Sequence, residues 1–339
     1  MKKACLFVSQ AYTKNKIFSY QDIALNRDDV LRPYRHLKTL FEKNGFSIDT
    51  QDICSPEQAD VVIYLDLQDE SELPTSESLK KKCILVISEC EVIYPHNWTV
   101  ETHAHFSRIL TWNPTYWDGR KYFETRFPIL LQTAFFNRHF NRKRLVTLIA
   151  GNKLSRRPLE LYSKRREAIC WFERHHPEHF EFYGLGWDRF ASRFRKITAI
   201  VNRLGLSSFL RPRFKSYQGP VKSKFEVLSQ YRFAICFENA EKIPGYITEK
   251  IFDCFSCGTI PIYWGAPDIL EHVPAECFID FRNFKDYEDL HQFLLTIDSA
   301  THARYMDAIW SFMHSEKIKP FLYPTVNQNT LAAAQAIVG

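Results

Sequence analysis

Glu249 and Lys250 stand side by side within residues 245–265, GYITEKIFDCFSCGTIPIYWG, where a turn leads into an apolar run. Thr248 is a favourable N-cap, so the spacing predicts a helix that begins here. The unpaired N–H groups and positive dipole end of such a helix suit a diphosphate, and Lys250 adds a full charge. Glu249 can accept two hydrogen bonds from a vicinal diol such as a ribose. The pattern therefore favours a site for a nucleotide sugar.

The same stretch also fits an ordinary amphipathic helix with no ligand. Glu249 and Lys250 would then face water, and the core face would consist of Ile247, Ile251, Phe252 and Phe255. Spacing alone leaves both interpretations open. In either case Gly258 can end the helix in the left-handed conformation.

A second group of candidates follows the apolar run in CILVISECEVIYPHNW. This predicted strand ends in Glu89 and Glu91, which point the same way along an extended chain. Transfer of a sugar to a hydroxyl group would need a carboxylate as a general base to take the proton of that hydroxyl. The residues do not decide which of the two would serve. Two carboxylates at this spacing could instead hold a divalent metal, or be solvated acids at the start of a loop.

Two other motifs with metal-ligand spacing are interpreted as structural. HHPEH at residues 175–179 formally fits the H-x-x-E-H pattern of one metalloprotease group. Pro177 would break the helix that must carry both histidines, so we expect a solvated loop. Cys254 and Cys257 have C-x-x-C spacing without a second pair, and we expect small core residues. We expect no metal site.

The elements that must position these residues alternate between strands and helices. In the first half we expect a helix over 28–45 and buried strands over 3–10, 59–67, 81–91 and 106–113. In the second half we expect helices over 162–175, 221–231 and 247–258, and strands over 145–151, 180–184, 232–239 and 259–265. This alternation is typical of parallel sheets with helices on both faces.

The length of 339 residues fits two such domains. We expect an α/β protein with two Rossmann-type domains facing across a cleft. Residues 1–140 would form an acceptor-side domain and 141–316 a donor domain, with the tail 317–339 packing back on the first. By fold analogy this is the GT-B architecture of glycosyltransferases.

Residues 231–269, YRFAICFENAEKIPGYITEKIFDCFSCGTIPIYWGAPDI, resemble the donor-site signature of glycosyltransferase family 10, the α-1,3/1,4-fucosyltransferases, in its bacterial form. A strand, the FEN turn, GY-ITEK and the G-TIP-Y-G-P strand and loop occur in order. The resemblance covers most of residues 145–285 and only scattered points before them. It implies inverting transfer of L-fucose from GDP-fucose to a hydroxyl of lipopolysaccharide or another surface glycan.

The resemblance also implies roles for single residues. The segment 150–173 resembles the one that supplies an arginine to the donor phosphates, and the register gives Arg166, with Arg165 as the alternative. The expected donor-binding residues are Arg166, Glu238, Asn239, Tyr246, Thr248, Glu249 and Lys250. The family pattern favours Glu89 as the base, whereas the spacing to Pro95 favours Glu91. Arg166 and Lys250 could neutralise the leaving phosphates, so we expect no required cofactor, although a divalent metal could stimulate the reaction.

The charge of the chain is concentrated in one segment. Against a net charge of +6, residues 189–215 hold eight Lys or Arg and no acid. Interleaved apolar residues predict a basic amphipathic helix that could lie on an anionic membrane or contact an acidic glycolipid. A solvated insertion would show the same pattern. Nucleic acid is not an expected partner, because zinc-finger spacing and RNA-binding signatures are missing.

The composition excludes several other classes of protein. With 45% hydrophobic and 25% charged residues, the chain is expected to be globular. No apolar run is long enough for a spanning helix, and the nine cysteines are scattered as in a reduced protein. We expect a cytoplasmic protein, with peripheral contact at the inner face of the membrane. A transferase for another nucleotide sugar and a non-catalytic glycan- or membrane-binding protein remain alternatives.

Overall fold

The computed structural model describes residues 1–22, 24–141, 144–192, 194–206 and 212–339. Contacts divide the chain into two compact units. Unit 1 comprises Met1–Leu130, Ile243–Glu249 and Ile318–Gly339, and unit 2 comprises Leu131–Lys242 and Lys250–Lys317. The sequence-based division used residues 140 and 316 and did not separate the short segment Ile243–Glu249 from its chain neighbours.

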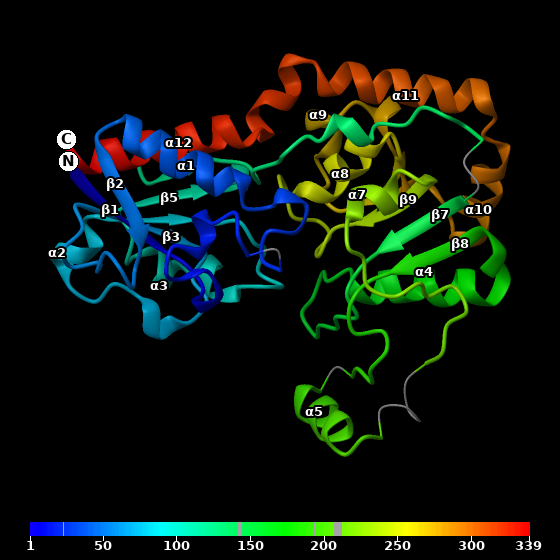
Figure 1. Cartoon of the computed structure of the whole chain (residues 1–339), viewed down its shortest axis with the longest axis horizontal. Coiled ribbons are helices and arrows are strands. Elements are labelled where there is room, and N and C mark those ends of the chain that lie inside the picture. Colours follow the sequence, from blue (N-terminus) through cyan, green and yellow to red (C-terminus); the bar gives the residue numbers. More distant parts are fainter. Residues whose placement is uncertain (23, 142–143, 193, 207–211) are drawn as a thin grey trace. The chain divides into compact units, whose positions relative to one another are not determined.

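Unit 1 contains one parallel sheet with the strand order β2-β1-β3-β4-β5-β6 (Figure 1). The strands are β1 (Lys2–Phe7), β2 (Phe46–Thr50), β3 (Val61–Leu65), β4 (Cys83–Val86), β5 (Arg108–Thr111) and β6 (Tyr122–Glu124). The helices are α1 (Arg32–Lys43), α2 (Glu77–Lys80), α3 (Val100–His103) and α12 (Tyr323–Val338). The four predicted strands are confirmed, whereas β2 and β6 are short, only partly apolar and were not predicted.

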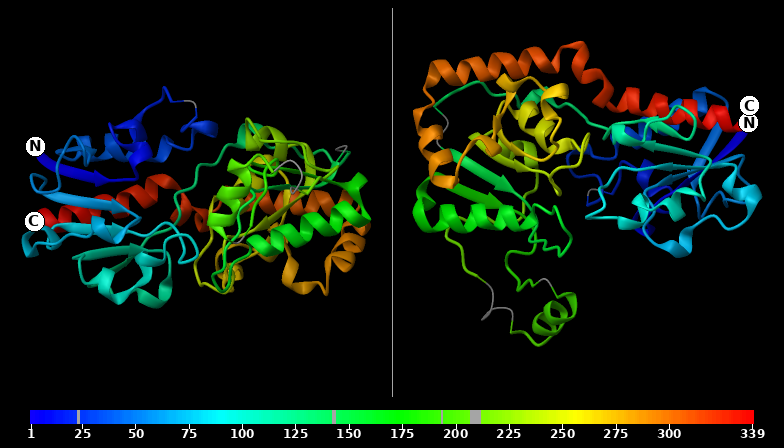
Figure 2. Two further views of the ribbon diagram at one scale, coloured as in Figure 1. Left: turned by 90° about the horizontal axis from the view of Figure 1, so that it is seen from below. Right: turned by 180° about the vertical axis from the view of Figure 1, so that it is seen from behind.

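Alternate side chains of these strands point to opposite faces of the sheet and pack into a hydrophobic core on each face. On one face, Leu6 and Ile63 pack with Phe41 of α1 and Leu331 of α12. The opposite core contains Cys5, Val62, Tyr64, Leu85 and Ile109. The C-terminal helix α12 is part of unit 1, since the Asn327 amide donates to the Pro33 carbonyl of α1 at 2.7 Å. Figure 2 shows the two helices side by side over the sheet.

Unit 2 contains a second parallel sheet with the order β11-β10-β9-β7-β8. Its strands are β7 (Arg144–Ile149), β8 (Phe180–Tyr183), β9 (Tyr231–Phe237), β10 (Ile260–Trp264) and β11 (Ile279–Asp280). Its helices are α4 (Tyr162–His175), α5 (Arg195–Arg203), α7 (Lys224–Leu228), α8 (Glu249–Cys257), α9 (Ile269–His272), α10 (Tyr287–Thr296) and α11 (Ser299–Met313). The Tyr287 hydroxyl of α10 donates to the Lys164 carbonyl of α4 at 3.0 Å, so α4 and α10 cover the same face.

The strand order of each sheet locates a switch point, where the chain winds outward in both directions. It lies between β1 and β3 in unit 1 and between β7 and β9 in unit 2. Ligands of open parallel sheets bind outside the carboxyl ends of the strands at such a point. The loops after β3, β7 and β9 are therefore the first places to look for a site.

Helix α8 begins and ends where the sequence predicts. It starts at Glu249, directly after Thr248, and ends at Cys257 before Gly258, whose φ is +60°. A Cβ at Gly258 would lie 2.7 Å from the Asn137 carbonyl oxygen, so the turn also requires a residue without a side chain. In the described part of the chain, no helix has both the length and the apolar character needed to cross a bilayer.

Candidate functional site

Arg166 lies at the switch point of unit 2 with an unusual set of partners. Its Nη1 donates to Asn152 Oδ1, and its guanidinium lies 5.4 Å from the centroid of the Trp187 ring. Among the described residues it forms no ion pair with a carboxylate. Burial lowers the pKa of Arg166, because the charged form is penalised away from water, but an arginine stays protonated at neutral pH. A half-buried cation with neutral partners is an environment that a bound anion would stabilise.

Asn152 places the acceptor that orients Arg166. It follows the carboxyl end of β7, and its Nδ2 donates to the Gly186 carbonyl at 3.0 Å. The strands β7 and β8 approach closely here, since a Cβ at Gly184 would lie 1.8 Å from the Ala150 carbonyl oxygen. Asn152 was not among the residues predicted from the sequence. The only feature of the sequence that could have pointed to Asn152 is its position directly after an apolar run.

Arg165 is a positioning residue in this geometry. Its side chain is buried, and Nη2 donates to the Phe237 carbonyl at 2.7 Å and to Asn239 Oδ1 at 3.0 Å. These bonds tie α4 to the carboxyl end of β9 and fix the amide of Asn239. Of the two candidate arginines, Arg166 is the one left with a charge to offer a ligand.

Lys250 and Glu238 form an ion pair that the sequence did not predict. Lys250 Nζ lies 3.0 Å from Glu238 Oε2, and the Glu238 side chain is 0% exposed. A Cβ at Gly265 would lie 2.5 Å from Glu238 Cγ, so the glycine allows this close packing. A buried carboxylate is costly unless it is paired, and Lys250 supplies the charge. Glu238 therefore positions Lys250, whose ammonium group has further protons to donate.

The segment Ile243–Glu249 carries predicted donor-site residues but packs with unit 1. The Tyr246 hydroxyl donates to Glu89 Oε2 at 3.0 Å, and the Tyr246 ring lies 4.9 Å from the Trp112 ring. Gly245 has a φ of +75°, and a Cβ there would lie 2.2 Å from the Trp112 carbonyl oxygen. The structure thus brings Tyr246, predicted to contact the donor, to Glu89, one of the two carboxylates predicted as the base. Thr248 is buried, and Glu249 is half-buried at the start of α8.

Glu89 and Glu91 have different surroundings. Glu89 is half-buried, its backbone N–H donates to Asp66 Oδ1 at 3.2 Å, and its backbone carbonyl accepts from Trp98 Nε1 at 3.2 Å. Glu91 is exposed. A general base must be held in place while the acceptor binds, and only Glu89 shows such support among the described contacts.

Asp66 is a functional candidate that sequence reasoning missed. It follows β3 at the switch point of unit 1, and its Oδ1 also accepts from Ser88 N at 2.9 Å and from Asn97 Nδ2 at 2.7 Å. Burial and, to a smaller extent, the neighbouring charge of Glu89 together raise the pKa of Asp66 to about 7, against the lowering effect of its hydrogen bonds. Asp66 thus lies buried directly beside the candidate base, and its Oδ1 accepts from the Glu89 backbone N–H. An acid at the end of an apolar run was the available signal, but its importance depends on the strand order.

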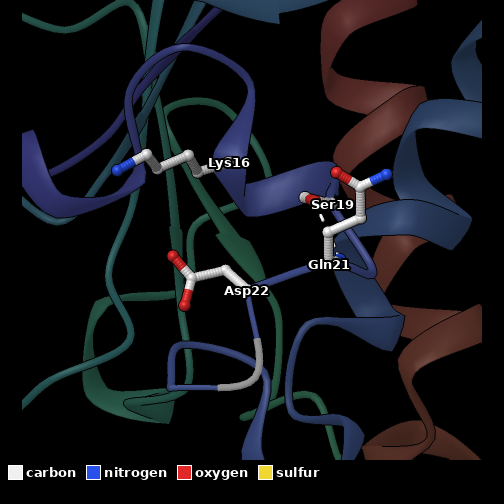
Figure 3. A pocket seen from close by; sticks show the side chains of 4 residues that line it. All are labelled: Lys16, Ser19, Gln21 and Asp22. Carbon is white, nitrogen blue, oxygen red and sulfur yellow. Dashed lines mark hydrogen bonds between the residues drawn. The ribbon is translucent and has the colours of Figure 1, made fainter.

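Unit 1 also has an open hollow of about 480 Å³, which Figure 3 shows. It is lined by Lys16, Ser19, Gln21 and Asp22. None of the predicted site residues lines it, so the hollow gives no support to the predicted chemistry.

Comparison with known proteins identifies similar sequences and folds. Residues 164–321 match the family model described as glycosyltransferase family 10 (fucosyltransferase), C-terminal part. The matched residues make up slightly less than half of the 339-residue chain. The resemblance noted in the sequence is thereby confirmed, and the matched residues include β9, α8 and all but the first two residues of α4, the elements that position Arg166, Asn239 and Lys250.

Two curated relatives show how far the similarity extends. The chain is 38% identical to the α-(1,3)-fucosyltransferase FucT of Helicobacter pylori over 90 residues, which is 26% of this chain and 18% of that protein. It is 29% identical to the gorilla 4-galactosyl-N-acetylglucosaminide 3-α-L-fucosyltransferase FUT6 over 152 residues, or 44% of this chain and 38% of that protein. The aligned regions thus span well under half of each relative.

Two solved structures show the fold of the whole chain. An α1,3-fucosyltransferase crystallised with GDP has a TM-score of 0.54 and 15% identity, covering 99% of this chain and 90% of that one. HepE of Anabaena in complex with UDP has a TM-score of 0.54 and 10% identity, covering 99% and 100%. The protein has the GT-B fold with two parallel-sheet α/β domains, as predicted.

Proposed function

We propose that the protein is an inverting fucosyltransferase that moves L-fucose from GDP-fucose to a hydroxyl of a glycan acceptor, such as lipopolysaccharide or another surface glycan. The observation that carries the proposal is Arg166, a half-buried cation with neutral partners at the switch point of unit 2, within the residues that match the family 10 model. A diphosphate supplies the anion that this position lacks. The name and GDP complex of the similar fucosyltransferase structure support guanosine diphosphate as the leaving group.

The proposed reaction is a single displacement. The Glu89 carboxylate takes the proton of the acceptor hydroxyl, whose oxygen attacks the anomeric carbon of fucose. The bond from that carbon to the β-phosphate oxygen breaks, and its electron pair leaves with GDP. Arg166 and Lys250 stabilise the negative charge that develops on the phosphates. Asn239 and Glu249 bind the nucleotide sugar, and Tyr246 holds Glu89 through their hydrogen bond.

We infer that this chemistry requires no divalent metal. Two cations, Arg166 and Lys250, belong to the proposed phosphate site, and the exposed Glu91 lacks the supporting contacts seen at Glu89. Transfer measured in EDTA should retain most of the rate measured with Mg²⁺ or Mn²⁺. A strict requirement for added metal would contradict this part of the proposal.

Nucleotide binding and product formation test the proposal separately. Titration calorimetry should show binding of GDP in the presence of EDTA, with UDP at least 10-fold weaker. Labelled GDP-fucose should then yield labelled product with a mixture of surface glycans. NMR should show that the anomeric configuration of the product is inverted relative to that of the donor. Binding of UDP in preference to GDP would favour a transferase for another nucleotide sugar. Binding of glycan without turnover would favour the non-catalytic alternative.

We further propose that helix α5 contacts an anionic membrane, where a lipid-linked acceptor would be found. Figure 1 shows α5 apart from the sheet of unit 2. Ile197, Ile200 and Leu204 are 46%, 56% and 65% exposed and share one helical face, with Lys196 and Arg203 beside them. Of the predicted basic segment, Arg193 and residues 207–211 lie outside the described residues.

Vesicle sedimentation tests the membrane contact independently of catalysis. The protein should bind vesicles that contain phosphatidylserine more strongly than vesicles of phosphatidylcholine alone. Ile200→Asp should weaken this binding, because it places a charge on the apolar face, and should leave GDP affinity unchanged. Equal sedimentation of the variant and the unaltered protein would contradict the membrane proposal but not the transferase.

A further inference from the structure

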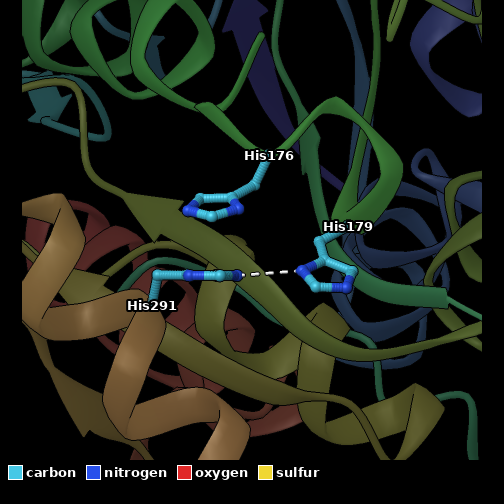
Figure 4. Close-up of side chains that lie close together, drawn as sticks. All are labelled: His176, His179 and His291. Carbon is cyan, nitrogen blue, oxygen red and sulfur yellow. Dashed lines mark hydrogen bonds between the residues drawn. The ribbon is translucent and has the colours of Figure 1, made fainter. Parts of the chain in front are cut away.

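Three histidines from separate parts of unit 2 converge beside α10. His176 follows α4, His179 ends the short 3-10 helix Pro177–His179, and His291 projects from α10 (Figure 4). One ring nitrogen from each histidine lies within 4.8 Å of the other two. His176 and His179 are half-buried, and His291 is 1% exposed. As expected, α4 ends before Pro177 and HHPEH stays partly exposed, but His176 and His179 are half-buried because His291 of α10 packs against them.

The ring geometry is close to that of a metal-ligand set. His179 Nδ1 lies 3.0 Å from His291 Nε2, and the rings of His176 and His291 stack with centroids 3.9 Å apart. Two imidazoles on a tetrahedral zinc ion, each about 2.0–2.1 Å from the metal, have nitrogens roughly 3.3 Å apart. Separation of these two nitrogens by a few tenths of an ångström, with a turn of both rings, would admit an ion between His179 and His291. His176 would have to turn out of its stack on His291 to join them.

The Glu178 carboxylate lies close enough to the cluster to be a fourth ligand. Glu178 Oε1 lies 3.5 Å from His176 Nδ1 and 3.9 Å from His179 Nδ1. Glu288 is near the same group, with Oε2 3.9 Å from His176 Nε2. Three imidazoles and a carboxylate are a donor set that suits zinc.

The cluster without an ion leaves hydrogen-bonding capacity unused. His291 Nδ1 is buried and has no hydrogen-bond partner among the described residues.

We propose that His176, His179 and His291, with Glu178 as the fourth ligand, bind one zinc ion. The ion would fasten the connection between α4 and β8 to α10 and so stabilise unit 2. Arg166 lies ten residues earlier in α4, about 15 Å along the helix axis. The zinc site is therefore separate from the proposed diphosphate site and takes no part in the transfer.

Zinc binding to the folded, reduced protein tests this inference. Because an exposed thiol also binds zinc, all variants carry Cys170→Ser. Competition with a chromophoric chelator should show one zinc ion per chain that depends on the cluster. His179→Gln should weaken binding at least 10-fold, while the matched His175→Gln should change it less than two-fold. His175 neighbours the cluster but is exposed, and its Nδ1 is bonded to the Trp171 carbonyl at 2.9 Å.

Cobalt provides a spectroscopic signature that does not depend on stability. Co²⁺ should give the visible absorption of a four-coordinate nitrogen and oxygen site, and this absorption should be lost in His179→Gln. A second group of three residues that could hold an ion, Asp268, Glu271 and His272, serves as the comparison site. Absence of zinc binding would overturn the inference. Equal affinity in His179→Gln, or loss in His272→Gln instead, would do the same.

Discussion

Replacement of Arg166 by methionine tests the proposed donor site most directly. Methionine keeps the aliphatic part of the side chain over the Trp187 ring, and it removes the charge and the bond to Asn152. In the free protein, the loss of one hydrogen bond and one cation–π contact is offset by relief of a half-buried charge. We therefore expect the free energy of unfolding without ligand to change by no more than about 1 kcal/mol.

The effect on GDP binding should be much larger. A hydrogen bond between charged partners contributes about 1.5–3 kcal/mol, which corresponds to roughly 10- to 150-fold in Kd. At a GDP concentration 100 times the Kd of the unaltered protein, bound GDP adds about 2.7 kcal/mol to its stability. If Arg166→Met raises the Kd 30-fold, the same concentration adds only about 0.9 kcal/mol. The loss should thus appear in both the binding constant and the stabilisation by ligand.

Titration calorimetry measures the Kd of GDP. Urea unfolding with and without GDP measures how much the bound nucleotide stabilises the protein. Lys164→Met is the matched control, because it removes the same charge from the same helix. Lys164 pairs with Glu167 at 2.7 Å, a surface ion pair of small energetic effect. Its GDP affinity should stay within two-fold. Unchanged GDP binding in Arg166→Met, or an equal loss in Lys164→Met, would refute the assignment of Arg166 to the phosphates.

Three further predictions concern the carboxylates. Glu89→Gln should lower kcat by about 10²–10⁴-fold with little change in GDP affinity, whereas Glu91→Gln should change kcat less than two-fold; the reverse pattern would identify Glu91 as the base. Lys250→Met should lower the free energy of unfolding by roughly 3–5 kcal/mol, because it removes the ion pair of the buried Glu238 carboxylate. Adding Glu238→Gln should restore much of that stability in urea titrations but not the GDP affinity. The pKa of Asp66 is raised to about 7 in the folded protein, whereas the unfolded chain releases this proton near pH 4. Between these pH values the folded state binds the proton more tightly, so the stability that protonated Asp66 contributes is lost as pH rises. The difference in stability between unaltered protein and Asp66→Asn should therefore shift by roughly 2–3 kcal/mol between pH 5 and pH 8; a difference independent of pH would show that Asp66 is ionised throughout.

Much of the fold could be predicted because its determinants are local. Continuous apolar runs predicted strands β1, β3, β4, β5, β7, β8, β9 and β10. Helical spacing predicted α4 with its observed bounds, and Gly258 predicted the end of α8. Strands β2, β6 and β11 are short or only partly apolar, so their pairing partners rather than their own patterns determine them.

The candidate site could be predicted only as a set of residue types. The motif around Glu249 and Lys250 indicated a nucleotide-sugar site, but it could not show that Lys250 pairs with Glu238 or that Tyr246 bonds to Glu89. These bonds join residues 12 and 157 positions apart. Asp66 was missed because its environment depends on the loop after β4.

The sequence by itself determined the α/β class, most strands and helices, and the family 10 signature, because side-chain periodicity and turn residues act over a few positions. Tertiary structure decided which charges are paired, which carboxylate is held in place, and that the segment Ile243–Glu249 packs with unit 1. It also brought His291 to His179 across 112 residues of chain. Ionisation and ligand geometry depend on burial and on distances between remote residues, and only the folded chain sets those.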